Sequence, residues 1–223
     1  MKYSIIIPIY NEVAFLPGLL SGLYDYFKSD NEIIIIDDGS TDGSLAILNK
    51  CDFIKLISFN ENRGKGSAIR IGLSEAENNS IIIFDGDLEM DPSQLRRLMI
   101  LDKKIGINSV MGYRFKHLRP VRSGDDWGNF IFTTFFNILL TTNHKDVLCC
   151  AKAFYKDDFD IRILQSKNFS IDIELTFILS LLDKSIKQVK MDYLRRGKNE
   201  GKKLEISNGW NILLRIVKMI KYF

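Results

Sequence analysis

The stretch Ser80-Ile81-Ile82-Ile83-Phe84-Asp85-Gly86-Asp87 decides the fold class of this 223-residue chain. Its apolar part has the β-branched composition of a strand that is covered on both faces, as in parallel sheets. Its end places two carboxylates at positions i and i+2, which an extended backbone directs to the same side. Hard oxygen ligands at this spacing can share one divalent cation. The stretch therefore predicts a buried strand that ends at a cation site, and a plain acidic turn is the alternative.

Similar β-branched runs and amphipathic segments alternate along the first half of the chain. The expected strands are Tyr3–Ile9, Glu32–Ile36, Phe53–Ser58, Ser80–Phe84 and Asn108–Gly112. The expected helical segments between them lie near Val13–Phe27, Asp42–Lys50, Gly66–Ala76 and Pro92–Leu98. This alternation predicts right-handed βαβ units, and hence an α/β fold with a Rossmann-like, mostly parallel sheet flanked by helices in a single domain.

The second half is less regular. Residues Phe115–Asp126 are polar and predict no regular structure, whereas Trp127–Leu140 predicts a helix. The segment Asn208–Tyr222 predicts a basic amphipathic helix. Its basic face would either be solvated on a packed terminal helix or lie against anionic lipid.

Composition excludes several classes of protein. A net charge of +3 gives no general signature of nucleic-acid binding, although residues Lys184–Phe223 carry eleven Lys and Arg against three acids. Cys51, Cys149 and Cys150 form no Cys-x-x-Cys pair, which favours free thiols in a reducing cytoplasm over a zinc site. The longest apolar stretch, Phe130–Leu140, falls short of the roughly 20 residues of a membrane span. We therefore expect a soluble or peripheral protein.

Ligands of open α/β sheets bind beyond the carboxyl ends of the strands, and the polar clusters of this chain fall there. The cluster Asp37–Gly43 is either a capped turn or a site for a nucleotide base and ribose. The cluster Arg63-Gly64-Lys65-Gly66 lacks the spacing of a P-loop, so its glycines favour close packing before a helix. The cluster Arg195–Lys203 is either a solvated loop or a basic lid that neutralises a diphosphate.

Five sequence motifs occur in order and carry a family resemblance. They are Pro8-x-Tyr10-Asn11-Glu12, Asp37-Asp38-Gly39-Ser40-x-Asp42-Gly43, Gly64-Lys65-Gly66-x-Ala68, Asp85-Gly86-Asp87-Leu88-Glu89-x-Asp91-Pro92 and Gly112-Tyr113-Arg114. With the closing Tyr193-x-x-Arg196-x-x-x-Glu200-Gly201-Lys202-Lys203, the chain resembles the family 2 glycosyltransferases of GT-A fold, in the group similar to dolichol-phosphate mannosyltransferase. The stretch Cys149–Lys152 departs from the usual Gly-Phe-Arg/Lys loop of that group.

The resemblance implies roles for particular residues. Those implied to bind the nucleoside or the donor diphosphate are Pro8, Tyr10, Glu12, Asp38, Asp85, Gly86, Arg114, Arg196 and Lys202. Those implied to hold Mg²⁺ or Mn²⁺ are Asp85, Asp87 and Glu89. Asp87 and Arg196 would also act in catalysis, and Asp146, Asp172 and Glu174 would lie near the acceptor. Residues 1–112 would form the nucleotide-sugar half and 113–223 the acceptor half, with a basic C-terminal lid and helix.

The implied reaction is inverting, metal-dependent transfer of a sugar from a GDP- or UDP-sugar in cell-envelope polysaccharide or glycoconjugate synthesis. A saccharide acceptor needs a base, for which Asp172 and Glu174 are the candidates, whereas polyprenyl phosphate is already anionic and needs none. The protein would be cytoplasmic, either free or peripheral at the inner face of the plasma membrane. A sugar nucleotidyltransferase would carry a Gly-rich loop where Tyr10-Asn11-Glu12 stands. An inactive nucleotide-sugar-binding module would lack intact acids and an intact basic lid.

Overall fold

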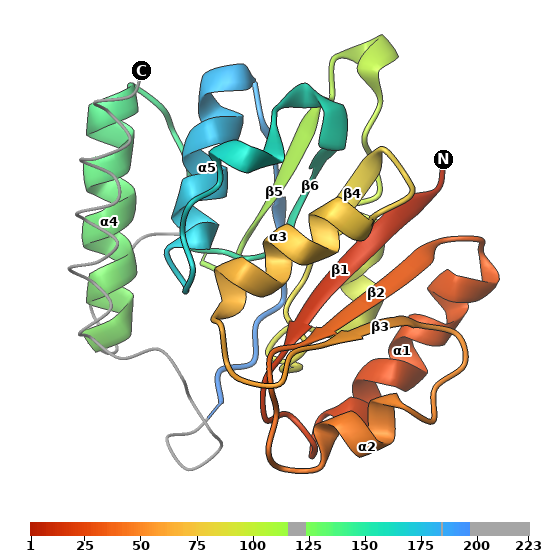
Figure 1. Cartoon of the computed structure of the whole chain (residues 1–223). Coiled ribbons are helices and arrows are strands. Elements are labelled where there is room, and N and C mark those ends of the chain that lie inside the picture. The colour runs from red at the N-terminus through yellow and green to blue at the C-terminus, as the bar shows by residue number, and fades with distance from the viewer. Residues whose placement is uncertain (116–123, 184, 197–223) are drawn as a thin grey trace.

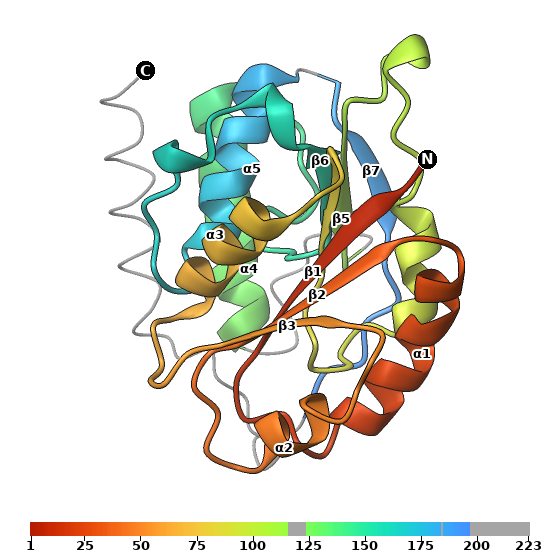
Figure 2. The ribbon, with the colours of Figure 1, turned by 45° about the vertical axis from the view of Figure 1, so that its right-hand side comes forward.

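The computed structural model describes residues 1–115, 124–183 and 185–196 of the chain. The seven strands of the described residues form one sheet in the order β3-β2-β1-β4-β6-β5-β7 (Figures 1 and 2). The strand bounds are β1 Tyr3–Ile9, β2 Glu32–Asp37, β3 Lys55–Ser58, β4 Ser80–Ile83, β5 Ser109–Tyr113, β6 Lys152–Tyr155 and β7 Lys187–Lys190. Within this sheet β6 is antiparallel to both β4 and β5, and the other neighbours pair in parallel.

Helices cover both faces of the sheet. The α-helices are α1 Leu16–Lys28, α2 Ser44–Leu48, α3 Lys65–Glu75, α4 Gly124–Leu140 and α5 Ile171–Leu182. The short 3-10 helices are η1 Pro92–Arg97, η2 Lys103–Ile105, η3 Lys156–Asp158 and η4 Ile161–Ile163. The buried side chains of α1, α2 and η1 pack on one face of the sheet, and those of α3, α4 and α5 pack on the other.

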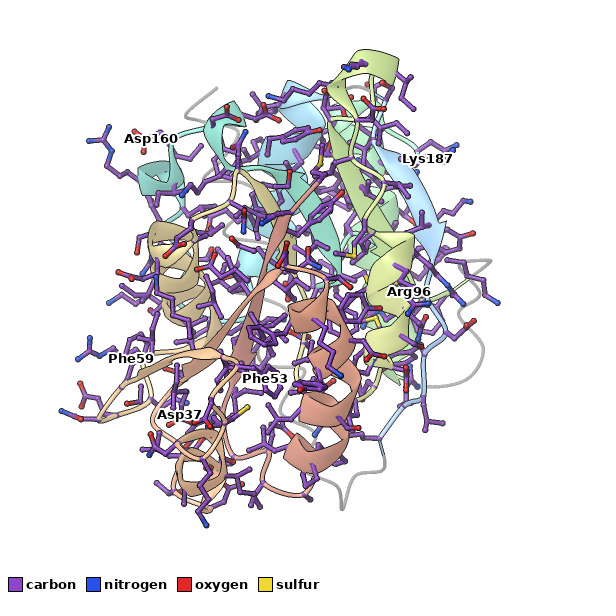
Figure 3. All side chains as sticks on the ribbon, turned by 90° about the vertical axis from the view of Figure 1, so that its right-hand side faces the viewer. Asp37, Phe53, Phe59, Arg96, Asp160 and Lys187 are labelled. Carbon is purple, nitrogen blue, oxygen red and sulfur yellow. The ribbon has the colours of Figure 1, made fainter. Side chains whose placement is uncertain are left out.

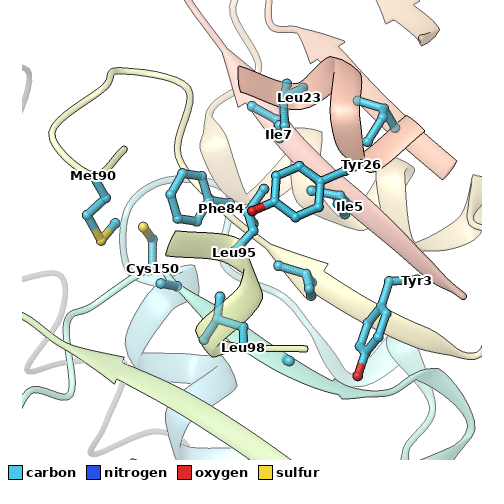
Figure 4. Close-up of a cluster of buried hydrophobic side chains, with 14 of the residues drawn as sticks. Tyr3, Ile5, Ile7, Leu23, Tyr26, Phe84, Met90, Leu95, Leu98 and Cys150 are labelled. Atoms are coloured by element: carbon cyan, nitrogen blue, oxygen red, sulfur yellow. The ribbon is translucent and has the colours of Figure 1, made fainter. Parts of the chain in front are cut away.

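The alternation of β1 shows how the sequence builds this two-sided core. Ile5 and Ile7 face the α1 side, where Figure 4 shows them beside Leu23 and Leu95, whereas Ile6 faces the α3 side. All three isoleucines are fully buried. Burying each such side chain contributes about 1.5–3 kcal/mol, which explains why β1, β2 and β4 are rich in consecutive isoleucines.

The structure confirms the predicted α/β class and, to within about two residues at each end, the five predicted strands, and it corrects two expectations. Residues Pro92–Arg97 form a 3-10 helix rather than an α-helix. Helix α4 begins at Gly124, so residues 124–126 are helical although they were expected to lack regular structure. The sequence did not predict β6 and β7, which are short and each begin with a lysine. The closing helix expected at 208–222 lies outside the described residues.

The parallel arrangement gathers the loops after β1, β2, β3 and β4 at one edge of the sheet. Figure 3 shows Asp37, the last residue of β2, at the opposite end of the molecule from Lys187, the first residue of β7. The polar clusters predicted to follow the strands therefore meet at one carboxyl edge. In the described ranges, no helix has both the length and the apolar character needed to cross a membrane.

Candidate active site

The core fixes the acidic turn that follows β4. A Cβ on Gly86 would lie 2.1 Å from Cδ1 of Ile9 and 3.0 Å from Cγ2 of Ile7, so the glycine between the two acids lets the turn pack closely on the side chains of β1. Leu88 follows with a φ of 57°, a strained left-handed conformation for a residue with a side chain. The side chains of Asp85 and Asp87 are 28% and 18% exposed. Both carboxylates are thus held at the sheet edge while remaining accessible to a small ligand.

Asp85 pairs with a lysine from the first turn of α3. Nζ of Lys65 lies 2.8 Å from Oδ1 of Asp85 and 2.9 Å from Oδ2 of Asp172 in the first turn of α5. The Lys65 side chain is only 9% exposed, and its ammonium lies 5.7 Å from the centroid of the Phe169 ring. Lys65 therefore joins three elements that are distant in sequence and compensates two poorly solvated carboxylates.

Asp87 pairs with a different cation. Arg196 donates from Nη2 to Oδ2 of Asp87 and from Nη1 to Oε2 of Glu12, both at 2.9 Å. The backbone N–H of Arg196 donates to Oε1 of Glu89 at 3.1 Å, and its guanidinium lies 5.1 Å from the centroid of the Phe15 ring. The two acids of the turn therefore do not share one partner, because each has its own cation.

The pKa values of the two acids differ for this reason. Burial would raise the pKa of Asp85, but the Lys65 ammonium outweighs burial and holds that pKa below its usual value. Burial and then the charge of Asp85 raise the pKa of Asp87 to about 7, against the opposing effect of Arg196. Asp87 is therefore a carboxylate whose ionised form an additional cation would stabilise.

Hydrogen bonds join the loop after β1 to the loop after β2. The backbone N–H of Asn11 donates to Oγ of Ser40 at 2.8 Å, and that of Glu12 donates to Oγ of Ser44 at 3.1 Å. Asn11 has a φ of 51°, a conformation that asparagine tolerates better than most residues. These bonds hold the Tyr10-Asn11-Glu12 segment against the predicted nucleoside cluster.

The two acids at the end of β2 have different surroundings. Asp38 accepts hydrogen bonds from the backbone N–H groups of Arg63 at 2.8 Å and Gly64 at 2.9 Å. Asp37 is fully buried and accepts one bond from the N–H of Ser40 at 3.3 Å, while its Oδ1 has no hydrogen-bond partner among the described residues. A buried acceptor without a partner is costly. Asp37, which was not singled out from the sequence, thus keeps an unsatisfied buried acceptor at the end of β2, and Asp38 secures the loop before α3.

The glycines beside Lys65 bring α3 into close contact with the loop before α5. A Cβ on Gly66 would lie 2.1 Å from the carbonyl oxygen of Ser166, and one on Gly64 would lie 2.2 Å from Oδ1 of Asn168. The N–H of Gly66 donates to the carbonyl oxygen of Lys167 at 2.7 Å. These contacts confirm that the glycines permit close packing, as the sequence predicted.

Arg114, which was expected to reach the donor, is held by an acid in this structure. Its Nε and Nη2 donate to the two carboxylate oxygens of Asp146 at 2.8 and 3.0 Å. The guanidinium lies 5.5 Å from the ring centroid of Phe115 and 5.3 Å from that of Tyr193. The bidentate pair and the two rings fix Arg114 at the end of β5.

The two candidate bases on α5 are both engaged. Oδ2 of Asp172 contacts Lys65, whereas its Oδ1 is buried without a partner in the part of the chain that the structure describes. Glu174 is 1% exposed and accepts the backbone N–H groups of Gln165 and Ser166 at 2.9 and 2.8 Å. Glu174 therefore anchors the loop before α5, and Asp172 is the member of the pair that faces the acidic turn through Lys65.

The acids around the turn suit a hard divalent cation, although Lys65 and Arg196 hold them in this structure. Within the described ranges, no group of three or more His, Cys, Asp or Glu side chains is already arranged as a metal site. Asp85, Asp87 and Glu89 nevertheless offer the carboxylate oxygens that Mg²⁺ and Mn²⁺ prefer. Burial, and then the charge of Asp85, raise the pKa of Asp87 to about 7, so a cation placed beside these carboxylates would favour the ionised form. The donor set therefore fits the predicted ion.

The remaining expected residues are placed as follows. Pro8 lies within β1 opposite Ile36 of β2, and Tyr10 is half-buried just beyond that strand. Cys51, Cys149 and Cys150 are free thiols, as expected. Lys202 lies outside the described residues. Lys65 was not predicted from the sequence as a partner of the acidic turn, because 20 residues separate it from Asp85 and no local pattern links the two.

Comparison with known proteins identifies the family. The model of "Glycosyl transferase family 2" matches residues 4–164. This chain belongs to glycosyl transferase family 2. Among its curated relatives, the uncharacterized glycosyltransferase YkcC of Bacillus subtilis is 35% identical over 123 residues, which cover 52% of this chain and 38% of the relative. The undecaprenyl-phosphate 4-deoxy-4-formamido-L-arabinose transferase of Proteus mirabilis is 29% identical over 171 residues, which cover 71% of this chain and 50% of that relative. This family 2 chain thus matches half or less of the length of these relatives.

Solved structures confirm the GT-A fold. The glucosyl-3-phosphoglycerate synthase of Mycobacterium tuberculosis, solved with Mn²⁺, UDP-glucose and phosphoglyceric acid, superposes with a TM-score of 0.73 at 17% identity, covering 97% of this chain and 79% of that one. The mannosyl-3-phosphoglycerate synthase of Rubrobacter xylanophilus superposes with a TM-score of 0.71 at 14% identity. The superposition covers 98% of this chain and 73% of that one. At these identities the likeness concerns the fold.

Proposed function

We propose that this family 2 chain transfers a sugar from a nucleoside diphosphate sugar to polyprenyl phosphate, with inversion at the anomeric carbon and with dependence on Mg²⁺ or Mn²⁺. The observation that carries the proposal is the turn after β4, where Asp85 and Asp87 are fixed at the carboxyl edge of the sheet with separate cationic partners. This edge is where open α/β sheets bind their ligands.

The names of similar proteins support each substrate class. The mycobacterial neighbour was solved with Mn²⁺ and UDP-glucose, which supports a nucleoside diphosphate sugar as donor. The Proteus relative is named for transfer involving undecaprenyl phosphate, which supports a polyprenyl phosphate acceptor and a place in cell-envelope synthesis. Such an acceptor resides in a membrane, so we place the protein peripherally at the cytoplasmic face of that membrane. UDP and GDP are both retained as candidate nucleotides.

Donor binding would use groups from four strand ends. Oδ1 of Asp37 would accept a hydrogen bond from the base or ribose, and Tyr10 would line the nucleoside pocket with Pro8 and Asp38. Asp85, Asp87 and Glu89 would hold the cation, which when bound offsets the charge that develops on the diphosphate leaving group. Arg196 and Lys202 would add positive charge to the same diphosphate.

The environment of the acids on α5 favours a phosphate acceptor over a sugar hydroxyl. A hydroxyl needs a base within hydrogen-bond reach. Asp172 is paired with the Lys65 ammonium at 2.9 Å, and Glu174 is committed to two backbone N–H groups. A phosphate monoester is already anionic and attacks the anomeric carbon without transferring a proton to either acid. The reaction is then a single displacement, in which the acceptor oxygen forms the new bond as the diphosphate leaves.

A thermal-shift screen tests the proposal even though the transferred sugar is not specified. UDP-sugars and GDP-sugars are added to the protein with and without Mn²⁺, and each ligand that raises the unfolding temperature is then incubated with undecaprenyl phosphate. A ligand at a hundredfold excess over its Kd stabilises the fold by about 2.7 kcal/mol. We expect Mn²⁺-dependent stabilisation by one nucleotide class and formation of a glycolipid. The absence of any stabilising nucleotide would contradict the proposal.

A further inference from the structure

Arg196 is bound to the acids that the proposed function assigns to the donor site. Its guanidinium bridges Glu12, which follows β1, and Asp87, which follows β4, with both distances at 2.9 Å. Its Nε lies 3.9 Å from Oε1 of Glu89, which also accepts its backbone N–H. The side chain is 10% exposed and lies against Phe15. The arginine thus lies among three carboxylates.

Both oxygens of Asp87 are occupied in this arrangement. Oδ1 accepts the backbone N–H of Glu89 at 3.1 Å, and Oδ2 accepts Nη2 of Arg196. A divalent cation bound to Asp87 would lie beside the Arg196 guanidinium, and the repulsion between the two positive charges disfavours keeping both at this carboxylate. The contact with Glu89 belongs to the backbone of the strained turn, whereas the contact with Arg196 is made by a long side chain. Arg196 is therefore the contact that yields.

Lys65 provides the contrast. Its ammonium lies between Asp85 and Asp172, and the glycines on either side of it pack α3 tightly against the loop at 166–168. Movement of Lys65 would leave two poorly solvated carboxylates without a partner. Lys65 is thus a permanent partner of Asp85, and Arg196 is the exchangeable cation of the pair.

We propose that Arg196 is a tethered counter-cation of the metal site, which occupies the Glu12, Asp87 and Glu89 carboxylates when no donor is bound and moves to the donor diphosphate when a divalent cation takes its place. This inference rests on the proposed metal-dependent donor binding and concerns how that site is regulated. The exchange keeps the acids compensated in both states. The metal alone should bind weakly, because it must displace a guanidinium. The metal and the diphosphate together should bind strongly, because Arg196 then gains a new anionic partner.

The test compares two affinities that should change in opposite directions. Free Mn²⁺ is measured by electron paramagnetic resonance during titration of the protein with Mn²⁺ alone, and UDP and GDP affinities are measured by calorimetry with saturating Mn²⁺. We expect Arg196→Gln to bind Mn²⁺ alone at least about tenfold more tightly than the wild type, because a like charge has been removed. It should bind the nucleoside diphosphate at least about tenfold more weakly, because a charge-assisted contact to phosphate is lost. Arg196→Lys should lie between the wild type and Arg196→Gln in both assays.

Arg195→Gln is the matched control, since it removes the same charge from the neighbouring residue, whose side chain hydrogen-bonds Tyr193. We expect both of its affinities to stay within about threefold of the wild type, since a partly solvated charge is screened. Unchanged or weaker Mn²⁺ binding by Arg196→Gln would overturn the inference, as would equal effects of the two glutamine variants. Tight Mn²⁺-dependent nucleotide binding by the wild type in that case would leave the proposed function intact. Failure of the wild type to bind either nucleoside diphosphate in the presence of Mn²⁺ would overturn both.

Discussion

Nζ of Lys65 and Oδ2 of Asp172 lie 2.9 Å apart and join the first turn of α3 to the first turn of α5. The same ammonium also contacts Asp85, so one buried charge links the acidic turn after β4 to helix α5. Removal of one member of a buried ion pair leaves an uncompensated charge, which costs more than the pair contributes. The stability of the fold should therefore depend on this lysine.

Lys65→Met should lower the free energy of unfolding by about 3–5 kcal/mol, because it leaves Asp85 and Asp172 without their shared cation. Urea denaturation measures the change. The double variant Lys65→Met/Asp172→Asn removes one of the two carboxylates as well and should recover part of the loss. A free energy of unfolding of Lys65→Met within about 1 kcal/mol of the wild-type value would contradict this prediction. It would show that Asp85 and Asp172 are exposed enough for water to replace the ammonium.

Gly66→Ala should lower the free energy of unfolding by about 1–3 kcal/mol, because the new methyl group meets the carbonyl oxygen of Ser166. Gly128→Ala is the control, since Gly128 lies within α4 and a Cβ there meets nothing within 4 Å. That change should stabilise the protein by about 0.5–1 kcal/mol through helix propensity. Equal effects of the two substitutions would contradict the close packing of α3 on the loop before α5.

The strands of the sheet and the contacts of Lys65 show how much of the structure could be predicted from the sequence. The isoleucine runs and the glycines around Lys65 are local patterns, and they correctly gave the first four strands and the close packing before α3. Strands β6 and β7 could not be predicted, because Lys152–Tyr155 and Lys187–Lys190 lack the run of consecutive isoleucines that marks the equally short β4. The acids at 85 and 87 were recognised as a pair from their spacing. Their different partners, Lys65 and Arg196, depend on contacts between residues about 20 and 109 positions apart, which no local pattern encodes.

His144 should make stability depend on pH. The residue is 6% exposed, and Nε2 of its ring lies 2.8 Å from Oγ of Ser180. Burial, and then the charge of Lys152, lower its pKa to about 4. The histidine takes up a proton near pH 6.5 in the unfolded chain but only near pH 4 in the folded chain. The contribution of neutral His144 to the free energy of unfolding is therefore fully present above pH 6.5 and is lost as the pH falls toward 4. The loss should approach about 3 kcal/mol.

Urea denaturation between pH 7.5 and pH 4.5 checks this prediction by comparing the wild type with His144→Gln. Carboxylates that titrate in the same range contribute equally to both proteins, so the difference between the two curves isolates the histidine. The wild type should lose stability faster than the variant as the pH falls. Parallel curves would show that the imidazole is protonated as easily in the folded chain as in the unfolded one.

Asp172→Asn should reduce kcat for transfer to undecaprenyl phosphate by less than about tenfold, because an anionic acceptor needs no base. Loss of a general base costs about 10²–10⁴ in rate, so a fall of that size would favour a hydroxyl acceptor. The assay follows glycolipid formation with the donor found in the thermal-shift screen. Asp87→Asn in the same assay gives the rate expected when a donor-site carboxylate is lost.

The most direct test of the account is calorimetric titration of UDP and GDP onto the wild type and Asp87→Asn, each with and without Mn²⁺. The account predicts that one nucleoside diphosphate binds the wild type tightly only when Mn²⁺ is present, and that Asp87→Asn loses this metal-dependent gain. Thermal unfolding of the variant serves as the control for its fold, since the substitution removes a like-charged neighbour of Asp85 and should not destabilise the chain. Nucleotide binding that is independent of Mn²⁺, or that is equally tight in Asp87→Asn, would contradict the assignment of the acidic turn as a metal-dependent donor site.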